Sequence, residues 1–468
     1  MLPLLWQRSE MALPEKHKRL GIVYFTLLLS IYACSAQSDS PDTSQFTTTI
    51  IPTGADPDAL AVADVNHDGA PDIIAANPES GTVTVLLGDG RGHFHHSPGS
   101  PFPAGHQPSD VGIGDFNGDG HADLLITNHQ TPYVTLLLGD GRGHFHHSPG
   151  SPFPAEHEPS DVGIGDFNGD GHADLLIANH QSPYVTLLLG DGKGVFHPAP
   201  NSPFTVNAKP HPHGVALAHF CGKDQPLDAA IDSWGTEQVE LLIGDGKGNL
   251  KNGPMFSAGP GSDLPLRSAD FNRDGFPDIV MPDTAIGRWN VNKVSVLLGD
   301  GKCGFHAAPG SPFPAGAVPW SVAVGDLNND GIPDMVLTPY GPEVHDARQI
   351  AATILLGDGN GAFHPMPGSP FALPGCTSPS RVAIGSTSGN SLRDFAITCD
   401  SSASVLLFLH QQKGGFRLFT LNVASSLNGA GPKPSERGIL FADLLGDGRD
   451  DLIISNSSAG TITLLLHK

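Results

Sequence analysis

Residues 109–147 read SDVGIGDFNGDGHADLLITNHQTPYVTLLLGDGRGHFHH and contain one complete structural unit of this chain. An alternating run at 109–114 leads into an Asp/Asn/Gly loop, and apolar runs follow at 123–126 and 133–138. The last of these enters a Gly-Asp-Gly turn, and Asp-Gly between apolar runs favours a tight hairpin because such turns need positive φ. With a further strand starting at Phe145, the unit is predicted to form four antiparallel strands.

The unit repeats along the chain. Residues 97–145 return almost unchanged at 148–196, a spacing of 51 residues. The same frame recurs more loosely, with loops that begin at Asp64, Asp115, Asp166, His219, Asp270, Asp326, Ser386 and Asp443. One four-stranded sheet cannot bury both of its faces, so the copies are expected to pack around an axis. The prediction is an all-β fold, a β-propeller of about eight four-stranded blades, with seven as the alternative.

The two ends of the chain predict how the ring closes. The eighth unit ends at 462–468, directly after its third strand, while residues 45–51 look like a fourth strand that precedes the first loop. We expect the N-terminal strand to pair with the C-terminal blade, which leaves no unpaired sheet edge there.

Five loops carry the pattern D-x-N-x-D-G-x-x-D, in which oxygen-bearing side chains alternate. Calcium prefers six to eight hard oxygen ligands, so this spacing predicts about five Ca²⁺ sites. The candidate metal ligands are Asp64, Asn66, Asp68 and Asp72; Asp115, Asn117, Asp119 and Asp123; Asp166, Asn168, Asp170 and Asp174; Asp270, Asn272, Asp274 and Asp278; and Asp326, Asn328, Asp330 and Asp334. The seventh-position carbonyl is expected to add a ligand, and the apolar second position to plug the core. Asp-Gly turns without metal are the alternative.

The pattern differs from an EF-hand, which needs a Glu at position 12, where these loops have apolar residues such as Ile126. The eighth loop is a weaker candidate, with Asp443, Asp447 and Asp451 but Leu445 at the third position. The seventh loop keeps one carboxylate, Asp394, and the fourth has lost the pattern.

Charge composition supports a cation-binding chain. There are 48 acidic residues against 25 Lys and Arg, a formal net charge of -23. This composition argues against nucleic acid as a partner, because phosphate binding needs clustered basic residues. Since carboxylates crowded into one loop repel one another, bound calcium is expected to couple to folding.

The first residues predict export. A basic segment at 16–19 precedes a largely apolar run at 20–33, followed by Cys34-Ser35-Ala36. Residues 1–36 are therefore assigned to a signal peptide or lipoprotein signal, 37–44 to a short linker and 45–468 to the propeller. A lipid on Cys34, cleavage after Ala36 and a retained membrane anchor remain alternatives. The mature protein is expected to be secreted, periplasmic or at the cell surface.

Four further cysteines, Cys221, Cys303, Cys376 and Cys399, allow two disulfides in three connectivities. Cys376 with Cys399 is the preferred pair. These two cysteines flank the seventh unit, so a disulfide there could replace a lost metal clamp.

At the Asp loops the chain resembles the FG-GAP/VCBS repeat family, which includes the propellers of integrin α-subunits. The resemblance covers essentially everything after residue 45. It implies a β-propeller with calcium in the hairpin between the first and second strands of a blade, and a role in adhesion or ligand binding. The implied partner is an extracellular protein or glycan.

Two other functions stay open: a lectin, and a calcium-dependent polysaccharide lyase. An enzyme needs converging acids and bases, and the best insertions for them, at 209–213 and 342–348, are more typical of ordinary loops. Among tryptophans, which often form sugar platforms, Trp234, Trp289 and Trp320 lie in the repeats. Histidine pairs such as His95-His96 recur at one blade position, which indicates copying of a surface strand more than a zinc site.

Overall fold

The computed structural model describes residues 45–207, 212–233, 238–258, 266–282, 292–340, 344, 349–389, 391–400, 404–412, 414–423 and 438–468. The predicted signal segment, Trp234, Trp289 and most of the two insertions lie outside these residues. The chain divides into two compact units, Met1–Asp39 and Ser40–Lys468, and the second unit is the one described below. Within the described residues, no helix has the length and apolar character to span a membrane.

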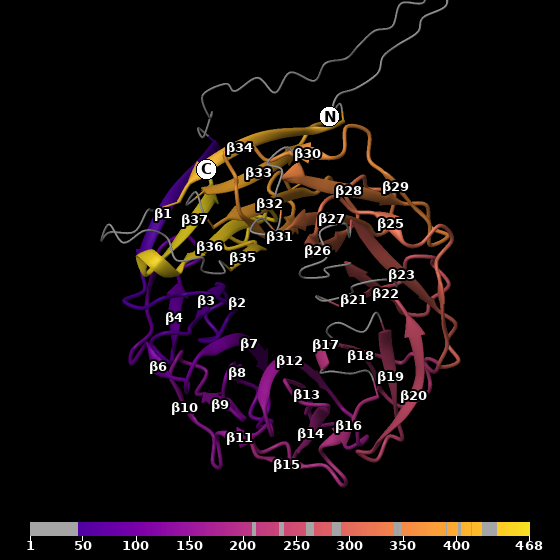
Figure 1. The fold of residues 1–468 in the computed structure, drawn as a ribbon. Helices are drawn as coiled ribbons and strands as arrows, with labels where there is room; N and C mark the ends of the chain where they lie inside the picture. The colour runs from indigo at the N-terminus through magenta and orange to yellow at the C-terminus, as the bar shows by residue number, and fades with distance from the viewer. Residues whose placement is uncertain are drawn as a thin grey trace, which may run out of the picture. The chain divides into compact units, whose positions relative to one another are not determined.

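The second unit is a ring of eight antiparallel sheets, so the prediction of an eight-bladed propeller is confirmed (Figure 1). In each blade the first strand lies innermost and the fourth lies at the rim (Figure 1). We number the blades I to VIII in chain order.

The strands of the first four blades are as follows. Blade I contains β2 (Leu60–Ala63), β3 (Asp72–Asn77), β4 (Thr82–Gly88), β5 (Phe94–His96) and β6 (Phe102–Pro103). Blade II contains β7 (Pro108–Gly114), β8 (Asp123–Asn128), β9 (Tyr133–Gly139), β10 (Phe145–His147) and β11 (Phe153–Pro154). Blade III contains β12 (Glu158–Gly165), β13 (Asp174–His180), β14 (Tyr184–Gly190), β15 (Phe196–Pro198) and β16 (Phe204–Thr205). Blade IV contains β17 (Pro212–Ala218), β18 (Asp228–Ser233), β19 (Gln238–Gly244) and β20 (Leu250–Ser257).

The other four blades follow the same plan. Blade V contains β21 (Arg267–Ala269), β22 (Asp278–Pro282), β23 (Lys293–Gly299), β24 (Phe305–Ala307) and β25 (Phe313–Pro314). Blade VI contains β26 (Pro319–Gly325), β27 (Asp334–Pro339), β28 (Ala351–Gly357), β29 (Phe363–Pro365) and β30 (Phe371–Ala372). Blade VII contains β31 (Pro379–Gly385), β32 (Asp394–Cys399), β33 (Ser404–His410) and β34 (Phe416–Asn422). Blade VIII contains β35 (Ile439–Ala442), β36 (Asp451–Asn456), a 3-10 turn η4 (Ser457–Ala459), β37 (Thr461–His467) and, from the other end of the chain, β1 (Phe46–Pro52).

Ring closure occurs as expected from the sequence. Strand β1 pairs antiparallel with β37 along its whole length, from Phe46 opposite His467 to Pro52 opposite Thr461. Phe46 and Ile51 are buried by this pairing. The N-terminal strand thus supplies the fourth strand of blade VIII and satisfies the edge of β37.

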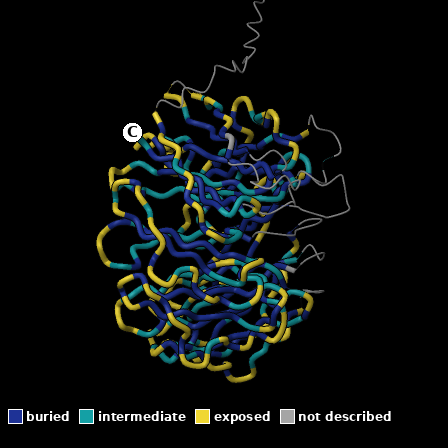
Figure 2. Tube along the Cα trace, turned by 90° about the vertical axis from the view of Figure 1, so that its left-hand side faces the viewer, coloured by how far each residue is buried: buried dark blue, intermediate teal, exposed yellow. Residues whose placement is uncertain are grey.

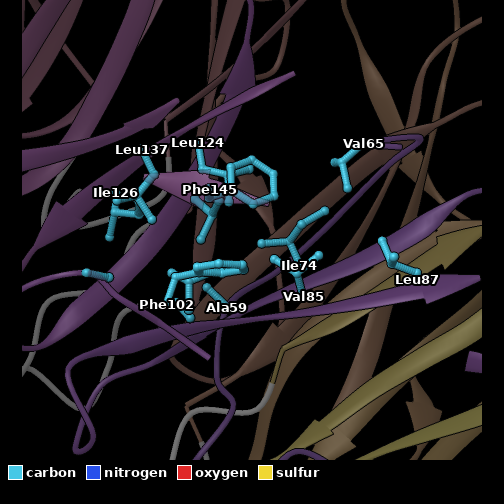
Figure 3. Packing of buried hydrophobic residues seen from close by; sticks show 14 residues of the cluster. Ala59, Val65, Ile74, Val85, Leu87, Phe102, Leu124, Ile126, Leu137 and Phe145 are labelled. Atoms are coloured by element: carbon cyan, nitrogen blue, oxygen red, sulfur yellow. The ribbon is translucent and has the colours of Figure 1, made fainter. Parts of the chain in front are cut away.

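The hydrophobic core lies between neighbouring blades. Between blades I and II, for example, Ile74 and Val85 pack with Leu124, Ile126 and Phe145 in one buried cluster (Figure 3). Viewed from the side, buried residues follow the strands and exposed residues gather at the turns (Figure 2). The second-position apolar residues of the loops, such as Phe167 and Phe271, are almost fully buried, which confirms their role as core plugs.

The outer strand differs in one respect from the sequence prediction. The proline-rich segment that follows the short fourth strand returns to the sheet, so that Phe153 pairs with Val134 of β9. Between the two paired segments, the Ser151 hydroxyl accepts a hydrogen bond from the N–H of Leu136 (3.0 Å). The segment predicted to be a link is therefore part of the blade's outer edge.

Candidate functional site

The Asp loops connect the first and second strands of each blade. In loop I the first-position carboxylate folds back on the loop, accepting hydrogen bonds from the N–H groups of Asp68 (3.2 Å) and Gly69 (2.9 Å) at its two oxygens. Asp64 is half-buried, whereas Asp68 at the fifth position is exposed. The same first-position contact with the sixth-position glycine recurs in the other four intact loops at 2.8–2.9 Å. The structure therefore closes all five loops in one conformation.

The third and fifth positions also meet in every intact loop. The Asn side chain donates from Nδ2 to the Asp Oδ2 at 2.9–3.0 Å. Its own Oδ1 accepts the fifth-position N–H, as Asn66 does from Asp68 at 2.9 Å. Positions one, three and five of each intact loop are thus brought together in one turn by hydrogen bonds among their polar groups, as loop I shows.

The fourth position adopts a left-handed backbone. Glycine supplies it in loops II and III, but His67, Arg273 and Asn329 adopt φ near +60° in loops I, V and VI. A non-glycine residue there costs free energy, on the order of 1–2 kcal/mol. Two of these side chains contact the Asp loop of the next blade. His67 Nε2 lies 2.8 Å from His121 Nδ1, and Arg273 donates a hydrogen bond to the carbonyl oxygen of Asp330 (2.9 Å).

The ninth-position Asp differs from the other loop residues because it is fully buried. Asp72 is 0% exposed; its Oδ2 accepts the N–H of Val65 and its Oδ1 the N–H of Gly88, both at 2.8 Å. This carboxylate therefore ties the start of the loop to the end of the third strand. Burial, with a smaller contribution from the charges of Asp68 and Asp64, raises the pKa of Asp72 to about 6, although the two backbone hydrogen bonds act to lower the pKa.

The same buried Asp occurs in all eight blades, including those that have lost the loop pattern. In blade IV, Asp228 accepts the N–H groups of Cys221 (2.9 Å) and Gly244 (3.0 Å). In blade VII, Asp394 accepts those of Thr387 and His410 at 2.9 and 2.7 Å. Asp228 is one residue out of step in the sequence, yet the structure places it in the common position, opposite Ala218 at the start of β18.

In loop VIII, a basic side chain of the loop itself contacts one of the loop carboxylates. Arg449, at the seventh position, donates from Nε to Asp447 Oδ2 at 2.9 Å, and its Nη2 contacts the same oxygen. The pKa of Asp447 is lowered, chiefly by this side-chain hydrogen bond. Of the weaker candidate ligands, Asp443 still folds back on Gly448 (2.8 Å), and Asp451 is the buried ninth-position residue.

The described residues contain two disulfides. Cys376–Cys399 confirms the preferred pair. Cys399 pairs with Pro379, whereas loop VII joins Gly385 to Asp394 at the other end of these strands, so the prediction that this disulfide replaces a metal clamp in loop VII is wrong.

Cys221–Cys303 links loop IV to the Gly-Asp-Gly-type turn of blade V, where the N–H of Cys303 also donates to the Phe220 carbonyl (3.3 Å). A second contact joins the same two blades: the ammonium group of Lys223 in loop IV lies 5.8 Å from the centre of the Phe276 ring in loop V.

The repeated unit of this chain matches a known family of repeats. The FG-GAP-like repeat model matches residues 64–126, 115–177, 166–220 and 281–337. The chain therefore contains FG-GAP-like repeats. The first three matches begin at the first residues of the Asp loops in blades I, II and III, and each reaches the loop region of the next blade, so the unit of the family includes the junction between blades.

Solved structures with a similar fold include a lectin from Agrocybe aegerita that recognises non-reducing terminal N-acetylglucosamine. It shares 16% identity, with 69% of this chain and 90% of that chain covered, at a TM-score of 0.44. A putative 6-phosphogluconolactonase from Bacteroides fragilis shares 15% identity, with 82% and 97% covered, at a TM-score of 0.48. These similarities concern the fold and say nothing of ligand or activity here. No curated protein matches this FG-GAP-like chain in sequence.

Sequence reasoning missed one cluster in this FG-GAP-like propeller. His129, Glu158 and His180 place their ligand atoms within 4.8 Å of one another at the end of the blades opposite the Asp loops. A signal was available: Glu158 stands where the preceding near-copy has Gln107, while the two histidines are exactly one repeat apart at a spacing of 51 residues.

Proposed function

We propose that this protein is an exported, calcium-binding propeller that acts as an adhesion or ligand-binding module, with an extracellular protein or glycan as its ligand. Five Ca²⁺ ions would serve as clamps in the intact loops, held by the side chains at positions one, three, five and nine and by the seventh-position carbonyl. Bound calcium would supply positive charge to each loop and fix its conformation.

The donor set of the loops fits such an ion. Each intact loop offers three carboxylates and one amide oxygen, which are the hard ligands that calcium prefers. The ninth-position oxygens already accept one backbone N–H each, and a carboxylate oxygen has a second acceptor direction available. Five divalent ions would add ten positive charges to a formal net charge of -23.

The observation that carries the proposal is the contrast between loop VIII and the intact loops. Where Leu445 replaces the third-position ligand, Arg449 places a guanidinium directly on the Asp447 carboxylate. In loop IV, which has also lost the pattern, Cys221 is joined by a disulfide to Cys303 of blade V. A positive charge in loop VIII and a covalent link at loop IV thus accompany the loss of the ligand set, as expected if the intact loops depend on a cation. The disulfides also support export, since they persist in oxidising compartments.

The test is thermal unfolding of the mature protein in millimolar Ca²⁺ and in EGTA, with bound calcium counted by elemental analysis. We expect about five ions per chain and a large calcium-dependent rise in Tm, because ligands that bind only the folded state stabilise it. The variant Asp119→Asn is expected to lose one ion. No bound calcium and no change in Tm would refute the calcium clamps.

A glycan is favoured as the ligand by one aromatic pair. Trp320 and Tyr340 of blade VI are half-buried, with ring centroids 4.6 Å apart and planes 31° from parallel. They lie at the end of the blade opposite the Asp loops, where β26 begins and β27 has just ended. Screening a glycan array with the native chain and with Trp320→Ala tests this: binding that Trp320→Ala leaves intact would rule out this pair as the platform.

A further inference from the structure

Three metal-ligating side chains meet at the junction of blades II and III. His129 directly follows β8 of blade II, Glu158 begins β12 of blade III, and His180 ends β13 of the same blade. Glu158 and His180 are directly opposite each other in the antiparallel pairing of β12 with β13. Cross-strand partners have neighbouring side chains, so the sheet itself fixes two of the three groups.

The backbone fixes the third group. The N–H of His129 donates to the carbonyl oxygen of Gln107 at 2.9 Å, which anchors His129 to the residue just before β7. Its ring centroid lies 6.1 Å from that of His180, with the planes 33° apart. All three side chains are half-buried, so they are held by the blades and still reach solvent.

The distances suit a small ion. His180 Nδ1 lies 3.3 Å from Glu158 Oε2, and all three ligand atoms lie within 4.8 Å of one another. Ligand atoms around a tetrahedral zinc at about 2.0–2.1 Å lie about 3.3 Å apart. His180 Nδ1 and Glu158 Oε2 therefore already have the spacing that zinc requires. Rotation of the His129 side chain would bring its ring nitrogen to the same distance.

We propose that His129, Glu158 and His180 form a site for a borderline divalent transition-metal ion such as Zn²⁺. Imidazole nitrogens are good ligands for zinc, and two histidines with one carboxylate are a ligand set that leaves a coordination position open. Water or an oxygen atom of a ligand would take that position. The ion would also link blade II to blade III, because its ligands come from both.

The surroundings orient the carboxylate for this role. Gln181 donates from Nε2 to Glu158 Oε2 at 3.1 Å, and such contacts orient metal ligands. The His213 ring of blade IV lies edge-on to His180, with centroids 5.2 Å apart. The site is separate from the Asp loops, which offer oxygen ligands at the opposite end of the blades, so it does not rest on the calcium proposal.

The near-copies provide a conservative variant. Blade II has Gln107 where blade III has Glu158, and blade II folds with that residue in place. Glu158→Gln therefore removes a charged ligand while keeping a side chain that the repeat accommodates. His129→Asn removes a ligand from the other blade. His146→Asn with His147→Asn is the matched control, because these two histidines are exposed on the outer strand β10.

The experiment is a Co²⁺ titration of the untagged mature chain in millimolar Ca²⁺, followed by visible absorption and reversed with Zn²⁺. We expect one site whose absorption bands Zn²⁺ abolishes. Glu158→Gln and His129→Asn should each weaken binding by at least about tenfold, which is the loss that removal of even an outer partner causes. The control pair should bind as the native chain does.

Two results would overturn the proposal: unchanged Co²⁺ affinity in both ligand variants, or loss of the bands in the His146/His147 control. Melting temperatures in millimolar Ca²⁺, without transition metal, establish that each variant is folded. Should either variant fail to fold, zinc-edge anomalous scattering from crystals of the native chain decides instead, and zinc located elsewhere would reject the site.

Discussion

At the scale of single residues, the ninth-position Asp shows that a loop pattern can combine two roles. Each such carboxylate accepts two backbone N–H groups from separate segments, whether or not the rest of the ligand set survives. Buried N–H groups that lose their acceptor cost roughly 1–3 kcal/mol each. Retention of Asp228 and Asp394 in blades without the ligand pattern is therefore explained by hydrogen bonding, without calcium.

Asp228→Ala tests this role in a blade that has no calcium ligand set. We expect a loss of about 2–4 kcal/mol in the free energy of unfolding, because the N–H groups of Cys221 and Gly244 lose their partner. Urea unfolding in calcium and in EGTA should show the same loss in both. Asp123→Ala, in the intact loop II, should cost more in calcium than in EGTA. If Asp228→Ala destabilises only in calcium, the structural role is wrong.

At the scale of the element, loop VIII can be converted into an intact loop. Loops II and III have Asn at the third position and His at the seventh, where loop VIII has Leu445 and Arg449. We expect the double variant Leu445→Asn, Arg449→His to bind one more Ca²⁺ than the native chain, because it gains an oxygen ligand and loses the competing guanidinium. Elemental analysis or calorimetry counts the ions.

The single variant Leu445→Asn is the control for this conversion. It adds the ligand but keeps Arg449 on Asp447, so its calcium count should stay at the native value. An unchanged count in the double variant would show that the loop's ligand spacing is not sufficient for binding.

At the scale of the element, the sequence predicts some features of the fold and misses others. Strands and Asp loops follow from local signals, such as the Asp-Gly turns and alternating apolar runs within one repeat. The return of Phe153 to β9 was missed because a proline-rich segment is locally typical of a link. The cluster of His129, Glu158 and His180 was missed because its members come from two repeats, and only the packing of blades brings them together.

At the scale of the whole molecule, the ring depends on a strand contributed from the other end of the chain. Strand β1 covers the edge of β37 and buries Phe46 and Ile51. Blade VIII in turn packs on blade I through a cluster that includes Ile51, Ile73 and Ile453. Loss of β1 would therefore open a sheet edge and weaken the junction at which the ring closes.

A chain that starts at residue 53 should show this dependence. Relative to a chain that starts at residue 45, we expect a lower Tm and concentration-dependent self-association, since the exposed edge of β37 can pair with another copy. Scanning calorimetry and analytical ultracentrifugation measure the two effects.

A synthetic peptide of residues 45–52 should restore the Tm of the shorter chain by adding the missing strand in trans. A peptide with Phe46→Asp and Ile51→Asp should not, because its two buried side chains would bring charge into the core. Equal stability of the two chains without peptide would mean that β1 is dispensable, and that the other seven blades and three strands of blade VIII hold the ring closed by packing alone.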